Sequence, residues 1–183
     1  FKGSYPSDME EWLTLVDPAI RPGDLGLISQ PNDFLGINFY SRGLIAADKD
    51  GRPQGQKPER SVTAMGWEVY PEALYDLLVR VHRDYGPTRL YITENGAAYE
   101  DHLENGQIKD KERQSYLEAH IAQCARAIES GVPLKGYFVW SLLDNFEWAF
   151  GYDRRFGIIY VDFETQERIL KDSALWYRSF LRR

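Results

Sequence analysis

Three features that would each assign a protein to a class are scarce or absent in this sequence of 183 residues: paired cysteines, long apolar runs and excess positive charge. With Cys124 as the single cysteine, no intrachain disulfide can form, and a reducing, cytoplasmic location is the expectation. No apolar run reaches the roughly 18 residues of a membrane span, and no signal-peptide layout opens the chain. Because 22 basic residues stand against 28 acidic ones, neither nucleic acid nor a membrane is an expected partner.

Motifs for several common chemistries are missing as well. The sequence has no Gly-rich phosphate loop, and it has no Gly-x-Ser-x-Gly elbow that could supply a serine nucleophile. His82, His102 and His120 are dispersed without metal-ligand spacing, so we expect them on the surface or on helix faces. The chain also does not begin with methionine, which indicates that it is a piece of something longer.

The apolar residues that are present change their spacing in an order typical of alternating strands and helices. Short β-rich or continuously apolar runs predict strands at 33–41, 90–93 and 136–144. Amphipathic patterns predict helices from 71 to 85, from about 110 to 131 and from 173 to 181. Residues 48–60 are expected to form a long exposed loop, and the charged run 100–113 a solvated loop and helix start. Cys124 falls on an apolar helix face and is expected to be buried.

Strand-helix units of this kind imply an α/β protein with a parallel sheet. Three parallel strands would leave open edges and one uncovered face, whereas a complete (β/α)₈ barrel typically needs ~250 residues. We find no repeat, low-complexity tract or linker that would divide the chain. The sequence therefore predicts about three-eighths of a barrel, in one domain that spans residues 1–183.

Polar side chains follow each predicted strand, where the loops of parallel α/β folds bring reactive groups together. They are Asn38 and Tyr40 after the first strand, Glu94 and Asn95 after the second, and Asp144, Asn145, Glu147 and Trp148 after the third. A carboxylate such as Glu94, with a tyrosine from the neighbouring strand able to donate a hydrogen bond to it, is suitably placed to attack an electrophilic carbon.

Aromatic residues are unusually abundant, at 14% with five Trp and twelve Tyr, which is more than a core of this size needs. Flat apolar faces stack on sugar rings, while carboxylates and amides bind the hydroxyl groups. Four aromatic residues are expected near the same mouth as the polar side chains: Trp67, Trp140, Trp148 and Phe156. Trp176, in the last predicted helix, is expected in the core.

Two of these segments resemble signatures of glycoside hydrolase family 1, the β-glucosidase family. They are residues 91–96, Tyr-Ile-Thr-Glu-Asn-Gly, and residues 140–148, Trp-Ser-Leu-Leu-Asp-Asn-Phe-Glu-Trp. Residues 33–40, 66–71 and 155–158 resemble that family's sixth strand, aglycone-side segment and late loop. The resemblance covers essentially the whole chain, and it implies strands six to eight of a (β/α)₈ barrel with their helices.

The resemblance also implies a role for each site residue. Glu94 would be the nucleophile, Tyr40 would orient it, and Asn38 would lie beside them. Glu147 and Trp148 would bind sugar hydroxyls, Trp140 would stack beneath the sugar ring, and Trp67 and Phe156 would border the entrance and the leaving-group side. The implied mechanism is double displacement with retention on a β-glucoside or related β-glycoside, and it uses no metal or organic cofactor.

One part of the family pattern is missing, because no Asn-Glu-Pro motif occurs to supply the general acid/base. The resemblance implies that this residue belongs to an N-terminal portion of the same barrel, which is therefore the expected partner. We predict that the chain alone is not a competent glycosidase. Two other interpretations are a non-catalytic sugar-binding or scaffold fragment, for which Glu94 and Tyr40 would be unnecessary, and a deliberately split barrel. A second copy of the chain could also cover the open face.

Overall fold

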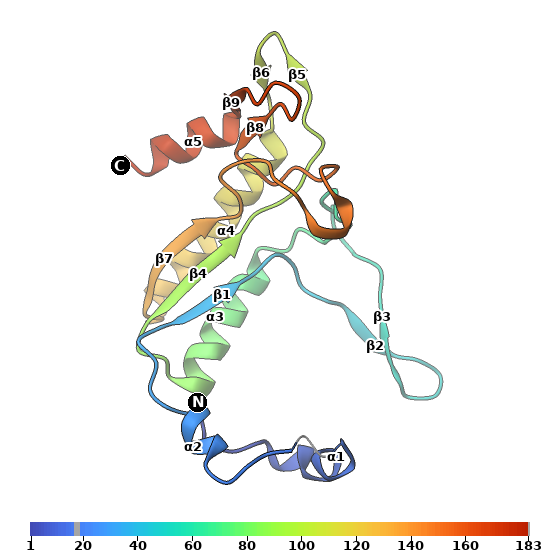
Figure 1. Ribbon diagram of the computed structural model, residues 1–183, viewed down its shortest axis with the longest axis vertical. Helices are drawn as coiled ribbons and strands as arrows, with labels where there is room; N and C mark the ends of the chain where they lie inside the picture. The colour runs from blue at the N-terminus through green and yellow to red at the C-terminus, as the bar shows by residue number, and fades with distance from the viewer. Residues whose placement is uncertain (17–18, 183) are drawn as a thin grey trace.

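The computed structural model describes residues 1–16 and 19–182, and a parallel sheet lies at its centre. Within those residues three strands pair in the order β1-β4-β7, with bounds Leu35–Asn38, Leu90–Asn95 and Leu134–Val139. Both neighbouring pairs are parallel. Figure 1 shows the three strands side by side, with the two longest helices along one face. The predicted order of strands and helices is confirmed.

The third predicted strand differs from the observed one. β7 begins at Leu134 and ends at Val139, so residues 140–144 lie outside it. The backbone N–H of Ser141 donates to the carbonyl oxygen of Phe156, and that of Asp144 donates to the carbonyl oxygen of Ile159. From Ser141 onward the chain therefore pairs with a later segment instead of continuing along β4.

The three predicted helices are confirmed as α3 (Glu72–Tyr85), α4 (Lys111–Glu129) and α5 (Asp172–Phe180). α3 ends at Gly86, whose φ of 57° is a left-handed conformation that glycine adopts without strain. The apolar stripes of α3 and α4 pack on the sheet and form its core with buried Phe39, Leu74, Leu78, Leu90, Ile92, Cys124, Ala127, Val132 and Leu134. Cys124 is thus buried, as expected. Trp176 is partly buried and packs against a second cluster that includes Tyr116 and Leu117.

The opposite face of the sheet is open. Along β4 the side chains of Leu90 and Ile92 are buried, whereas Thr93 is exposed, because alternate side chains of a strand point to opposite faces. Phe34 and Phe138 are 54% and 57% exposed. Parallel sheets are normally covered on both faces, so this structure presents one bare face, as expected for an incomplete barrel wall.

The remaining elements lie around this wall. Four are short helices: η1 (Ser7–Met9), α1 (Glu10–Val16), α2 (Asp24–Ile28) and η2 (Trp148–Phe150). Three antiparallel pairs are β2 (Ile45–Ala47) with β3 (Pro53–Gly55), β5 (Leu103–Glu104) with β6 (Gln107–Ile108), and β8 (Ile159–Val161) with β9 (Arg168–Leu170). Residues 49–60 are exposed, as predicted, and Asp48 is partly buried, but the segment includes β3 of a hairpin that projects from the sheet (Figure 1). Among the described residues, no helix has the length and apolar character needed to cross a bilayer.

Candidate active site

The ends of β1 and β4 bring Tyr40 and Glu94 into direct contact. Parallel pairing places Asn38 opposite Glu94, so the residues just beyond β1 lie beside the end of β4. The phenol of Tyr40 donates a hydrogen bond of 2.6 Å to the Glu94 carboxylate. Burial raises the pKa of Tyr40, and the bond to Glu94 adds to the rise, so the phenol keeps its proton and remains a donor. The pair has the geometry of a carboxylate that a neighbouring donor holds in one orientation.

Two residues of the loop after β7 form a second part of the site. Glu147 is partly buried, and its pKa is raised chiefly by this burial, with the charge of Glu94 adding to the effect. A side-chain hydrogen bond with Trp140 acts in the opposite direction. Glu147 therefore lies close enough to Glu94 for their charges to interact. Trp148, in contrast, is 81% exposed and has a φ of 41° at the start of η2.

Two aromatic rings, those of Trp67 and Phe156, pack against the ring of Tyr40. The centroid of the Tyr40 ring lies 5.3 Å from that of Trp67 and 6.0 Å from that of Phe156, and the last two lie 6.1 Å apart. Trp67 is partly exposed, but Phe156 is only 2% exposed. Phe156 therefore acts on the site through Tyr40 and Trp67, which it supports, and does not itself form the open border of an entrance.

Asn38 lies on the open face of the sheet beside these residues. Its side-chain oxygen accepts a hydrogen bond of 2.6 Å from the hydroxyl of Thr93, which precedes Glu94. Asn38, Tyr40 and Glu94 are thus gathered where β1 and β4 end, with the rings of Trp67 and Phe156 packed on Tyr40.

Gly96 allows the loops after β4 and β7 to approach each other. The N–H of Trp140 donates to the carbonyl oxygen of Asn95 at 2.9 Å, and a Cβ added to Gly96 would lie 1.7 Å from the Trp140 carbonyl oxygen. No side chain fits in that space. The glycine therefore sets how close the segment carrying Glu94 lies to the segment carrying Trp140.

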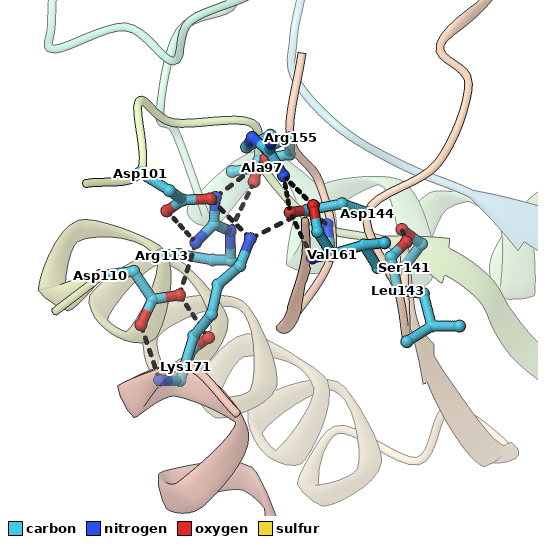
Figure 2. A network of polar contacts seen from close by, with 12 residues as sticks. Ala97, Asp101, Asp110, Arg113, Ser141, Leu143, Asp144, Arg155, Val161 and Lys171 are labelled. Carbon is cyan, nitrogen blue, oxygen red and sulfur yellow. Dashed lines mark hydrogen bonds and ion pairs between the residues drawn. The ribbon is translucent and has the colours of Figure 1, made fainter. Parts of the chain in front are cut away.

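Asp144 does not face the open site, although it was grouped with the strand-end cluster in the sequence. Figure 2 shows it in a buried network of charges. Its carboxylate binds Lys171 at 2.9 Å and Arg155 at 2.6 Å. Asp101 binds the same lysine at 2.5 Å and binds Arg113 at 2.9 Å. These contacts tie together the loops after β4 and β7 and the start of α5.

The expectation that residues 100–113 are a solvated loop and helix start is therefore wrong in part. The side chains of Asp101, Asp110 and Arg113 are at most 1% exposed. Arg113 also donates to the carbonyl oxygens of Ala97 and Arg155, at 3.1 and 2.8 Å. Burial of these charges is possible because each has a partner of opposite sign.

His120 lies on a helix face, as expected, but it is the face of α4 that is fully buried. Its ring stacks on that of Tyr116, with 3.9 Å between the centroids. Burial lowers the pKa of His120 to about 4. A signal was available in the sequence, since His120 lies three residues after Leu117 and four before Cys124, on the buried stripe of α4. Within residues 1–16 and 19–182, no three His, Cys, Asp or Glu side chains gather in a way that could hold a metal ion.

Comparison with known proteins identifies the family. The sequence profile described as Glycosyl hydrolase family 1 matches residues 1–183. The chain belongs to glycosyl hydrolase family 1. The resemblance seen in the strand-end segments is thereby confirmed over the whole length of the chain.

Relatives of this family 1 chain are β-glucosidases. Beta-glucosidase A of Thermotoga maritima is 48% identical over 185 residues, which cover 100% of this chain and 42% of the relative. Beta-glucosidase of an Agrobacterium species is 43% identical, over 97% of this chain and 40% of the relative. The chain thus spans about two-fifths of the length of these curated relatives.

Solved structures give the same result for the fold. The T. maritima β-glucosidase in complex with glucoimidazole superposes with a TM-score of 0.94 at 47% identity, covering 100% of this chain and 42% of that one. The complex of the same enzyme with isofagomine lactam gives 0.93 with the same coverage. The family 1 chain is therefore part of a (β/α)₈ barrel, as predicted.

Proposed function

We propose that the chain is the nucleophile-bearing, C-terminal portion of a retaining β-glycosidase that acts on β-glucosides or related β-glycosides. The observation that carries this proposal is the 2.6 Å hydrogen bond from the Tyr40 phenol to the Glu94 carboxylate. It fixes one carboxylate at the end of a barrel strand, where the reactive groups of such folds converge. The β-glucosidase names of the relatives support the substrate class.

In this proposal Glu94 attacks the anomeric carbon and forms a glycosyl-enzyme, which water then hydrolyses. Tyr40 keeps the attacking oxygen in place and, because its phenol stays protonated, stabilises the carboxylate until the bond forms. Asn38 lies beside this pair. The chemistry uses side chains alone and needs no cofactor.

The sugar is bound by residues of the loop after β7 and by the neighbouring aromatic rings. Glu147 and the exposed Trp148 bind hydroxyl groups, and Trp140 stacks beneath the sugar ring. Trp140 lies close enough to Glu147 to lower the pKa of that carboxyl, so the two side chains lie near each other. Trp67 lies on the leaving-group side, where the buried ring of Phe156 supports it.

A second carboxyl group is needed ~5–5.5 Å from the nucleophile to protonate the leaving oxygen. Glu147 is a poor candidate, because its place in the loop after β7, near Glu94, suits the binding of sugar hydroxyls better than protonation of the leaving oxygen. We therefore assign the acid/base to an N-terminal portion of the same single barrel domain. The exposed Phe34 and Phe138 on the bare face of the sheet support such a partner, because soluble proteins rarely leave large apolar patches uncovered.

The test is covalent trapping by 2,4-dinitrophenyl 2-deoxy-2-fluoro-β-glucoside, followed by intact mass and peptide mapping. Dinitrophenolate leaves without protonation, so labelling reports on the nucleophile and on sugar binding. We expect the complete barrel to be labelled on Glu94 and the Glu94→Gln variant to remain unlabelled. Glu104→Gln, at an exposed carboxylate of the β5–β6 hairpin, is the matched control and should label normally.

The same experiment separates the competing interpretations. Labelling at another residue would refute the assignment of Glu94 as the nucleophile. No labelling in a complete and folded barrel would refute it too, and would favour a non-catalytic sugar-binding fragment. The isolated chain should not turn over an aryl β-glucoside. Turnover that the isolated chain shows and Glu94→Gln abolishes would refute the need for an N-terminal portion.

A further inference from the structure

Behind the Tyr40–Glu94 pair lies a buried hydrogen-bond network centred on Asn95, the residue after Glu94. Asn95 is fully buried. Its amide nitrogen donates to the carbonyl oxygen of Phe39 at 2.7 Å and to the Tyr116 hydroxyl at 3.1 Å. Its amide oxygen accepts a bond of 2.5 Å from the Tyr137 hydroxyl. Both ends of the side chain are thus held, and this orientation fixes the backbone next to Glu94.

The Tyr116 hydroxyl also contacts the other member of the pair. It donates to the backbone carbonyl oxygen of Tyr40 at 2.7 Å while it accepts the bond from Asn95. A single oxygen on α4 therefore contacts both Tyr40 and the residue that follows Glu94. Together with the backbone bond from the N–H of Phe39 to the carbonyl oxygen of Glu94, it holds the end of β1 against the end of β4.

Tyr116 is itself rigidly placed. It is 1% exposed, and His120 stacks on its ring while a ring nitrogen of that histidine lies 2.7 Å from the Tyr116 carbonyl oxygen. Burial raises the pKa values of Tyr116 and Tyr137, so both hydroxyls keep the protons that they donate. In a site of this kind a small displacement of the attacking group has a large effect on rate.

We infer that Tyr116 is a positioning residue for the glycosylation step, and that it acts through Tyr40 and Asn95 with the support of Tyr137. This inference rests on the proposed function of Glu94 as nucleophile. Tyr116 does not touch the sugar, so its removal should slow the attack of Glu94 and leave the binding of the glycoside unchanged.

The test compares Tyr116→Phe and Tyr137→Phe with Tyr75→Phe in the complete barrel. Each change removes one hydroxyl and keeps the ring. The Tyr75 hydroxyl is hydrogen-bonded to Ser130, at the C-terminal end of α4, and takes no part in the bonds to Tyr40 and Asn95, so this variant is the matched control. The readouts are the rate constant for trapping by 2,4-dinitrophenyl 2-deoxy-2-fluoro-β-glucoside, the concentration for half-maximal trapping rate, and the melting temperature.

For Tyr116→Phe we expect the trapping rate constant to fall about tenfold, with the half-maximal concentration changed by less than about twofold, at a temperature well below melting. Tyr137→Phe should show the same pattern with a smaller decrease, and it tests the network independently if Tyr116→Phe fails to fold. Tyr75→Phe should match the wild type in all three readouts.

Two results would overturn the inference, and they differ from each other. If the wild-type barrel is labelled on Glu94, and Tyr116→Phe and Tyr137→Phe are labelled as fast as the wild type, then the network only stabilises the fold. The assignment of Glu94 as the nucleophile would still stand. A lowered melting temperature without a slower trapping rate leads to the same conclusion. If the wild type is not labelled on Glu94, the proposed function fails and the positioning role fails with it.

Discussion

Replacing Lys171 with methionine removes one charge from the buried network and keeps a side chain of similar length. The lysine side chain is 0% exposed, as are those of its partners Asp101 and Asp144. Its ammonium group lies 2.5 Å from one carboxylate and 2.9 Å from the other (Figure 2). In the methionine variant both carboxylates stay buried and lose this partner.

The expected cost follows from what the two carboxylates retain. Removing one member of a buried ion pair usually costs about 3–5 kcal/mol, because the other charge is left without compensation. Here Asp101 keeps Arg113, and Asp144 keeps Arg155. We therefore expect a loss near the lower limit, about 3 kcal/mol of the free energy of unfolding.

Urea titration of the complete barrel, wild type and Lys171→Met, measures this loss. The matched control is Arg80→Met, which removes a cation from an ion pair with Asp84 in which the arginine side chain is 75% exposed. Exposed pairs of this kind contribute at most about 1 kcal/mol. If Lys171→Met cost no more than Arg80→Met, the argument that burial makes this network critical would be wrong.

Three further predictions concern other parts of the structure. Burial lowers the pKa of His120 to about 4, so on acidification the unfolded chain binds a proton at this residue before the folded chain does. The free energy of unfolding should therefore fall by ~3 kcal/mol as pH drops from 6.5 towards 4. In urea titrations across that range, the free energy of unfolding of His120→Gln should depend less on pH than that of the wild type. The hydrogen bond from Arg42, with backbone hydrogen bonds, lowers the pKa of Glu68 to about 2. The stability that Glu68 adds relative to Glu68→Gln should therefore be complete above pH 4.5 and should vanish as pH falls through about 2. Thermal melting of both proteins at each pH measures this difference. Gly96→Ala should cost at least about 2 kcal/mol in urea titration, because its Cβ meets a carbonyl oxygen, whereas Gly43→Ala, with open space around it, should cost far less.

Local patterns in the sequence were sufficient for most of the fold. The spacing of Leu74 and Leu78, with Gly86 after them, gave α3 correctly, because a helix buries one stripe and ends where a left-handed residue follows. The apolar or β-branched residues 90–93 predicted the strand β4. The contact between Tyr40 and Glu94 followed from the rule that parallel strands end at the same edge of a sheet.

The same reasoning failed where a polar side chain is buried by a distant partner. Asp101 and Lys171 are 70 residues apart in the sequence, and neither has a local pattern that indicates burial. In the sequence, Asp110 and Arg113 resemble the charged start of an exposed helix. In the structure the start of α5 covers them, and the backbone N–H of Ser173 donates to Asp110. Charge in the sequence therefore could not distinguish solvated residues from buried ion pairs.

The sequence by itself determined the order of strands and helices, the family, and the residues that meet at the strand ends, because these depend on periodicity and on short segments. The tertiary structure alone decided that Asp144 belongs to a buried ion network, that Phe156 supports the site from behind, and that the Tyr116 hydroxyl bridges Tyr40 and Asn95. Whether a polar group is buried depends on partners that only folding brings within hydrogen-bond distance.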